Sequence, residues 1–133
     1  MKYLNLFESK DNIDHRKILR KILDIVFNNQ LISNKIENNF FGLLKYDSDL
    51  NKEVLVGAIT YHFEENNPFY NNGEFPENRY VIVIEDAEEI FDDNPDEPII
   101  DFDYIRIVPV DNNGNFSVDN LEKYLKQVYN NKR

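Results

Sequence analysis

The spacing of hydrophobic residues along the chain changes from a helical period to a strand period and back again. Between Ser9 and Asn29, apolar side chains recur at steps of three and four, as on one face of an amphipathic helix. These apolar residues are Ile18, Leu19, Ile22, Leu23, Ile25 and Val26. Ser9 or Asp11 is the expected cap of this helix, and the pair Asn28 and Asn29 is its expected end.

A second amphipathic helix is predicted near the end of the chain, over residues 118–129. Its apolar stripe consists of Leu121, Tyr124, Leu125 and Val128. Ser117 or Asp119 is the expected cap, and Glu122 follows Asp119 at the spacing of a capping box. The chain is therefore expected to contain one helix on either side of a central region.

In that central region, the hydrophobic period is two. Four strands are predicted there, at residues 40–46, 54–63, 80–85 and 103–110. Short sequential connections favour an antiparallel meander, and Pro109, which lacks an amide hydrogen, belongs at an edge or a bulge. The sequence thus predicts a single α+β domain over residues 1–133. Its N-terminal helix and its C-terminal helix pack on the same face of a four-stranded, mainly antiparallel sheet, and the second face is more polar.

Composition places the chain among globular proteins of one domain. It has 133 residues, 41% of them hydrophobic, and no cysteine, which excludes disulfides, thiolate metal sites and a cysteine nucleophile. The first ten residues lack the pattern of a secretory signal, and no run approaches the roughly 18 apolar residues of a spanning helix. We therefore expect a cytoplasmic location.

Charge is distributed very unevenly. The formal net charge is −10, and residues 80–105 contain ten acidic residues and no Lys or Arg. Nucleic acids and anionic membranes are bound by clustered basic residues, so the sequence predicts neither as a direct partner. It predicts a basic protein partner, which such a negative field would attract.

The first helix carries a basic cluster on the face opposite its apolar stripe. It consists of Arg16, Lys17, Arg20 and Lys21. A solvated helix face is the first interpretation of this cluster. The alternative is a homodimer in which the cluster meets the acidic segment of a second copy.

Two connections, 64–79 and 86–102, are longer than hairpin turns and are predicted to be loops. Both set aromatic residues among polar ones, as protein-binding surfaces do. The candidate partner-binding residues are Phe69, Tyr70, Phe75, Glu88, Glu89, Phe91, Asp92, Asp93, Asp96 and Glu97. The alternative is that the aromatic residues fold back and fix the loops to the body of the domain.

Two motifs suggest metal ions. Residues 111–122 resemble the calcium-binding loop of an EF-hand. However, Phe116 stands where that loop needs glycine, and a predicted strand rather than a helix precedes the loop. A strand-to-helix turn is therefore the preferred interpretation. Asp101 and Asp103, with Glu85 on a neighbouring strand, offer oxygen ligands for Mg²⁺ or Mn²⁺. Residues 80–105 contain no Lys or Arg to bind a phosphate and no histidine, so a solvated acidic surface is preferred and no cofactor or metal is predicted.

These observations favour a non-enzymatic acidic binding protein. In bulk properties alone, the chain resembles the small acidic immunity and inhibitor proteins that neutralise a basic partner such as a nuclease toxin. One alternative is a metal-dependent phosphoryl-transfer or hydrolytic enzyme that uses Glu85, Asp101 and Asp103. Others are a protein that mimics DNA and an acidic subunit of a larger assembly.

Overall fold

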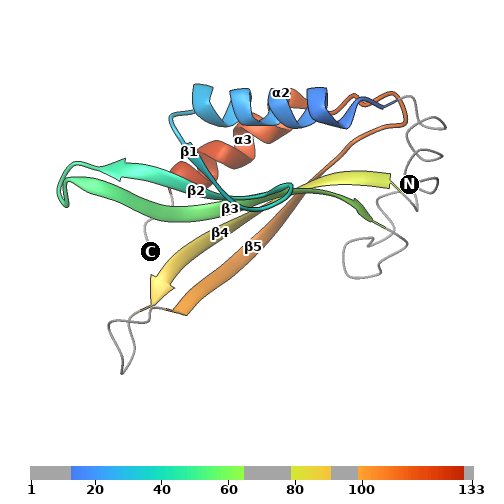
Figure 1. The fold of residues 1–133 in the computed structure, drawn as a ribbon. Coiled ribbons are helices and arrows are strands. Elements are labelled where there is room, and N and C mark those ends of the chain that lie inside the picture. The colour runs from blue at the N-terminus through green and yellow to red at the C-terminus, as the bar shows by residue number, and fades with distance from the viewer. Residues whose placement is uncertain (1–12, 65–78, 91–98, 131–133) are drawn as a thin grey trace.

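The computed structural model describes residues 13–64, 79–90 and 99–130. In these ranges the elements are α2 (His15–Asn28), β1 (Ile32–Glu37), β2 (Phe40–Asp47), β3 (Lys52–Glu64), β4 (Arg79–Ile90), β5 (Ile99–Pro109) and α3 (Val118–Tyr129). All neighbouring strands pair antiparallel, in the order in which they occur along the chain. The predicted α+β arrangement with an antiparallel sheet and two helices is confirmed (Figure 1).

The described sheet has five strands rather than the predicted four. The strand that the sequence did not reveal is β1, which pairs with β2 across a tight turn at Asn38 and Asn39. Five of its six residues are exposed, so it lacks the alternating apolar pattern of a half-buried strand. Main-chain pairing with β2, rather than side-chain burial, fixes this strand.

Both helices begin at side-chain caps. Asp14 precedes α2, and its carboxylate accepts a hydrogen bond from the Lys17 amide at 3.2 Å, so this helix begins later than Ser9 or Asp11 would have placed it. The Ser117 hydroxyl caps α3 by accepting from the Asn120 amide at 3.1 Å. The first expected cap is therefore wrong, and of the two alternatives for the second helix the structure selects Ser117.

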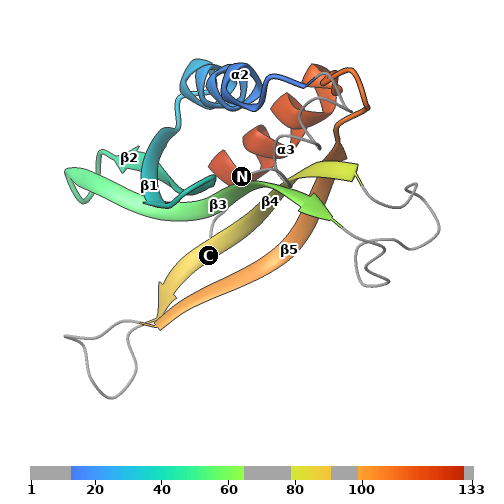
Figure 2. The same ribbon diagram turned by 45° about the vertical axis from the view of Figure 1, so that its right-hand side comes forward.

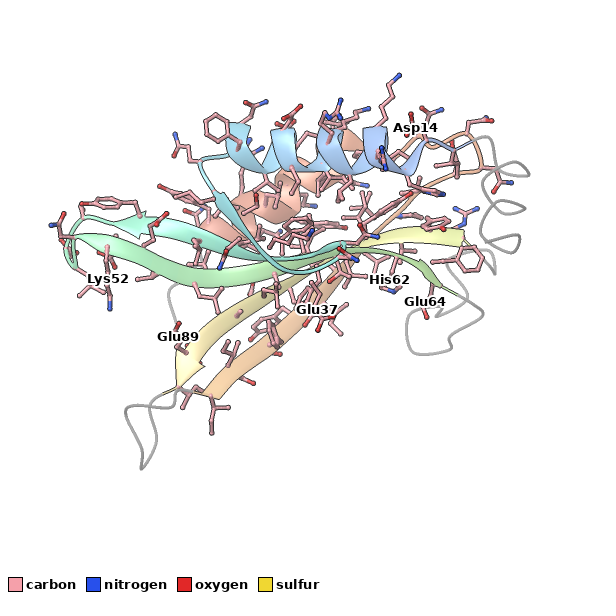
Figure 3. The ribbon with its side chains drawn as sticks, in the orientation of Figure 1. Asp14, Glu37, Lys52, His62, Glu64 and Glu89 are labelled. Atoms are coloured by element: carbon pink, nitrogen blue, oxygen red, sulfur yellow. The ribbon has the colours of Figure 1, made fainter. Side chains whose placement is uncertain are left out.

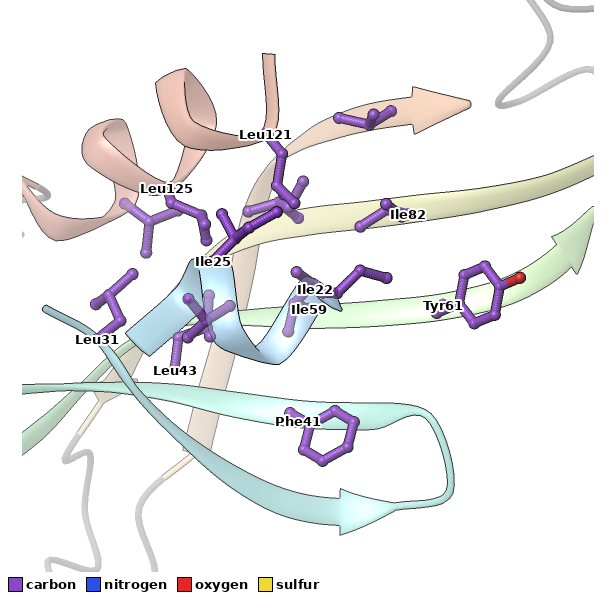
Figure 4. Close-up of a cluster of buried hydrophobic side chains, with 14 of the residues drawn as sticks. Ile22, Ile25, Leu31, Phe41, Leu43, Ile59, Tyr61, Ile82, Leu121 and Leu125 are labelled. Carbon is purple, nitrogen blue, oxygen red and sulfur yellow. The ribbon is translucent and has the colours of Figure 1, made fainter. Parts of the chain in front are cut away.

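A single hydrophobic core lies between the helices and the sheet. Both helices lie on the same face of the sheet, with α2 against β1 and α3 across β3, β4 and β5 (Figures 1 and 2). The fully buried side chains at its centre are Ile22, Val26, Leu31, Leu43, Ile59, Tyr61, Ile82, Ile84, Leu121 and Leu125 (Figure 4). The apolar stripes predicted for both helices therefore face this core.

The C-terminal helix α3 packs tightly against the sheet at Gly57 in β3. A Cβ atom at this position would lie 2.6 Å from the Glu85 carbonyl oxygen and 2.6 Å from Cγ1 of Val128 in α3. Only a residue without a side chain allows α3 to pack this tightly on the sheet. Gly57 thus helps set the position of the C-terminal helix.

A bulge in β3 changes the predicted alternation of side chains. Leu43 is opposite Gly57 but Leu44 is opposite Leu55, so Val56 is the extra residue. Because Gly57 and Ile59 face the helices, strict alternation would turn Leu55 toward them as well. The bulge reverses this order, so Val54 and Val56 face the helices and Leu55 faces the other side.

The face of the sheet opposite the helices is less polar than expected. It carries the buried residues Ala58, Val81, Val83 and Ala87, which lie outside the cluster that the helices cover.

Candidate partner-binding hairpin

Much of the segment that was predicted to be an acidic loop forms paired strands in the structure. Rather than forming a loop over residues 86–102, β4 continues to Ile90 and β5 starts at Ile99, and the two strands pair as far as those residues. We call residues 86–90 and 99–105 the outer hairpin. In Figures 1 and 2 this part of β4 and β5 extends beyond the ends of both helices.

Strand register gives the outer hairpin two different faces. Asp86 is opposite Asp103, and Glu88 is opposite Asp101. These four carboxylates therefore share one face, which we call the acidic face, on the side that the helices cover further along the strands. Like charges directly opposite each other in a sheet are destabilising. An opposite charge beside such a pair offsets the repulsion.

Arg106 places a positive charge beside this face. Arg106, opposite Ile84 in β4, holds Asp86 in a two-pronged ion pair, with Nη1 donating to Oδ1 at 2.9 Å and Nη2 donating to Oδ2 at 3.4 Å. Asp86 is buried, so this guanidinium compensates a carboxylate withdrawn from water. In the part of the chain that the structure describes, four carboxylates thus lie on the acidic face together with the guanidinium of Arg106.

Exposed apolar side chains accompany the charges. Ile99, Phe102 and Tyr104 are 58%, 41% and 62% exposed, and Ile100 and Ile105 are exposed as well. Tyr104 also has a φ of +56°, a left-handed conformation that is unusual for a bulky residue, at a register shift in β5. Large apolar residues placed beside a charged patch are typical of protein-binding surfaces.

Only two of the predicted partner-binding residues lie in the described ranges. Glu88 belongs to the acidic face, whereas Glu89 lies on the opposite face of β4, where it is paired with Ile100 (Figure 3). The remaining eight fall outside the described residues: Phe69, Tyr70, Phe75, Phe91, Asp92, Asp93, Asp96 and Glu97.

The sequence reasoning missed Asp86, Phe102 and Tyr104 as surface candidates. The alternation of apolar and acidic residues from 100 to 103 is a strand pattern, and it could have indicated that this part of the predicted loop is a strand.

The candidate metal ligands are not assembled. Asp101 and Asp103 share the acidic face, but Glu85 is opposite Ala58 and faces the other side of the sheet, because consecutive strand residues point to opposite faces. Burial raises the pKa of the Glu85 carboxyl above its ordinary value. Within the described part of the chain, no group of three His, Cys, Asp or Glu residues is placed to hold a metal ion.

The loop that resembles an EF-hand is a turn leading into α3. Oδ1 of Asp111 accepts hydrogen bonds from the amides of Asn113 and Asn115, both at 2.9 Å. Gly114 takes the left-handed conformation with a φ of +83°. The Asp111 carboxylate thus organises the local main chain, as expected for a strand-to-helix turn.

Both histidines form side-chain contacts far from the outer hairpin. Nδ1 of His15 is 2.7 Å from the Tyr61 hydroxyl, and the His15 ring lies 4.3 Å from that of Tyr80. His62 and Glu64 meet at 2.7 Å at the end of β3 (Figure 3). These contacts show how each histidine is held in the fold, and neither places one beside the acidic face.

No protein-family model matches the chain, and no curated protein or solved structure matches it either. Among the residues that the structure describes, no helix is both long enough and apolar enough to cross a membrane.

Proposed function

We propose that this protein is a non-enzymatic binding protein that neutralises a basic protein partner, in the manner of an immunity or inhibitor protein. The observation that supports this proposal is the direct opposition of Glu88 and Asp101 on a part of the sheet that the helices do not cover. Carboxylates that lie opposite each other attract positive charge to the same place. A basic partner would bring such charge to this part of the sheet, which supports a role in binding.

The proposed target is a protein with a cationic surface, such as a nuclease toxin, whose active site must attract phosphates. A strongly negative patch accelerates encounter with such a surface and makes the association rate sensitive to salt. The exposed side chains of Phe102 and Tyr104 supply the apolar contacts that hold the complex once it has formed. In this proposal, the charges govern association, and the apolar residues govern dissociation.

The test uses two variants with the same change in net charge. The first carries Glu88→Gln, Asp101→Asn and Asp103→Asn on the outer hairpin. The control carries Glu37→Gln, Asp49→Asn and Glu53→Gln, three exposed positions elsewhere on the molecule. Circular dichroism and thermal melts establish that both are folded.

The wild-type protein is first used at low salt to capture partners from an extract of the source organism, and a captured basic protein is then purified. We expect the hairpin variant to associate with it at least about tenfold more slowly at low salt, while the control stays near wild type. Equal association rates for the two variants would overturn the proposal, as would failure to capture any basic protein.

A further inference from the structure

The strand β5 is an edge of the described sheet. It pairs with β4 on one side and is the last in the strand order. The amide of Val110 donates to the Tyr80 carbonyl at 2.9 Å, so the preceding residue, Pro109, has its main-chain nitrogen on the open side. Because proline has no amide hydrogen, nothing is lost there, and the predicted placement of Pro109 at an edge is confirmed.

The two halves of this edge differ in their protection. Proteins commonly block an open edge with proline, with a bulge or with charged side chains, among which lysine is the most frequent. The inner half of β5 contains a proline and a basic residue, Pro109 and Arg106, but residues 99–105 contain neither. The charges on the outer half of this edge are acidic, so they repel acidic strands and not basic ones. Among the described residues, no strand pairs with the outer half of this edge, and exposed apolar side chains lie along it.

Main-chain direction along this half follows from the register. The Tyr80 carbonyl faces β5, where it accepts from Val110, and Asp86 and Glu88 follow it in β4 at even spacing, so their main-chain groups face β5 as well. Asp101 and Asp103 are opposite these two residues, so their main-chain groups face β4. Strand alternation then turns the main-chain groups of Ile100 and Phe102 to the open edge.

Charge decides which strand this edge accepts. Asp101 and Asp103 point to one face, and Ile100 and Phe102 point to the other. Pairing with β5 of a second copy, centred on Phe102, would bring Asp101 opposite the partner's Asp103, a repulsive arrangement. A strand that alternates basic and apolar residues would instead place its cations beside the two aspartates and its apolar side chains beside Ile100 and Phe102.

We propose that residues 99–105 of β5 dock an extended segment of the basic partner as an additional antiparallel or parallel strand, with Lys or Arg at every second position. This inference rests on the proposed function and specifies the form of the partner's contact. Main-chain hydrogen bonds supply affinity in such strand addition, and the alternating side chains supply specificity. The register shift at Tyr104 ends the regular part of the docking edge.

The experiment compares two labelled synthetic peptides of identical composition. One alternates lysine and valine over seven residues between threonine caps, and the other carries the same lysines and valines in two separate blocks. Binding to the full chain is measured by fluorescence anisotropy at low salt. We expect the alternating peptide to bind about tenfold more tightly, the effect of one or two net hydrogen bonds, and to slow amide hydrogen exchange at Ile100 and Phe102.

The matched variants are Ile100→Pro, which removes an amide hydrogen from the open edge, and Ile100→Ala, which keeps it. The proline variant should bind the alternating peptide no better than the block peptide, whereas the alanine variant should keep most of the preference. If Ile100→Pro perturbs the fold, the variant Asp101→Asn/Asp103→Asn tests the same site and should weaken binding of the alternating peptide.

Three results would overturn the inference. Equal binding of both peptides by the wild-type protein would exclude strand docking but leave salt-dependent capture of a basic protein, and hence the proposed function, intact. If the wild-type protein neither bound the peptides nor captured a basic protein, both the inference and the proposed function would be wrong. A concentration-dependent dimer in analytical ultracentrifugation that Ile100→Pro abolishes would identify a second copy as the occupant of this edge.

Discussion

The same two strands, β4 and β5, pass through two contrasting environments. Where the helices cover them, Ile82, Ile84 and Val108 are fully buried in a continuous core. In the outer hairpin, one face carries the four carboxylates and the exposed pair of Ile90 and Ile99. The other face carries Glu89 and the exposed side chains of Ile100 and Phe102. Main-chain pairing continues through both regions, so strand formation does not depend on burial.

The two regions contribute differently to the stability of the fold. The covered region contributes hydrophobic stabilisation, which increases with the apolar area removed from water. The outer hairpin contributes pairing but carries repulsive charge. Arg106 and Asp86 lie at the boundary between the two regions, where the first carboxylate of the acidic face is still buried.

The largest effect is expected in the covered region, at Gly57. In Gly57→Ala the new methyl group would collide with the main chain of β4 and with Val128, so we expect a loss of about 3 kcal/mol in the free energy of unfolding. Urea denaturation measures the change. The control is Gly42→Ala, whose methyl group would meet only the flexible ends of Leu55 and Ile36 among its nearest side chains, at 3.3 and 3.6 Å. Equal stability of the two variants would show that α3 does not depend on close contact at Gly57.

A smaller effect is expected at the boundary. Arg106→Ala leaves the Asp86 carboxylate buried without its ion-pair partner, and we expect a loss of about 2–3 kcal/mol. Arg106→Lys keeps the charge but not the two-pronged geometry and should lose less. If Arg106→Ala unfolds at the same denaturant concentration as wild type, this boundary contributes nothing to stability and the outer hairpin is energetically independent of the core.

The smallest effect concerns Glu85, on the opposite face of β4. Because burial raises its pKa in the folded state, the folded protein binds this proton more tightly than the unfolded chain does. The resulting stability is present below the ordinary pKa of 4.5 and is lost as pH rises through the folded-state value. Glu85→Gln should therefore melt slightly higher than wild type at pH 7, with the difference vanishing near pH 4.

Thermal melts between pH 4 and pH 7 test this expectation, with Glu37→Gln at an exposed position as the control. A difference between Glu85→Gln and wild type that stays constant over this range would assign the effect to packing rather than to the charge of Glu85.

Much of the fold could be predicted from local patterns. Ile18, Ile22 and Leu125 follow the helical period because one face of each helix is buried, so both helices could be predicted from the sequence. The strand β1 could not be predicted, because its exposed residues carry no alternating pattern. The bulge at Val56 could not be predicted either, since it depends on how β2 and β3 pair.

The candidate site was predicted less well than the fold. The concentration of acids identified the correct stretch of chain, but charge density favoured a loop where the structure has paired strands. In sequence, Asp101 and Asp103 suggest metal ligands together with Glu85, whereas the register places them with Asp86 and Glu88. A side chain's neighbours across a sheet depend on register, which no single segment encodes.

The sequence by itself determined the two amphipathic helices, most of the strands and the segment that carries the excess negative charge. These properties depend on residues close together in the chain, whose periodicity and composition can be read directly. Only the tertiary structure decided that this segment is a paired hairpin with an acidic face and an open edge. The reason is physical: its charges meet across strands, where pairing between distant residues, and not local preference, sets which side chains lie together.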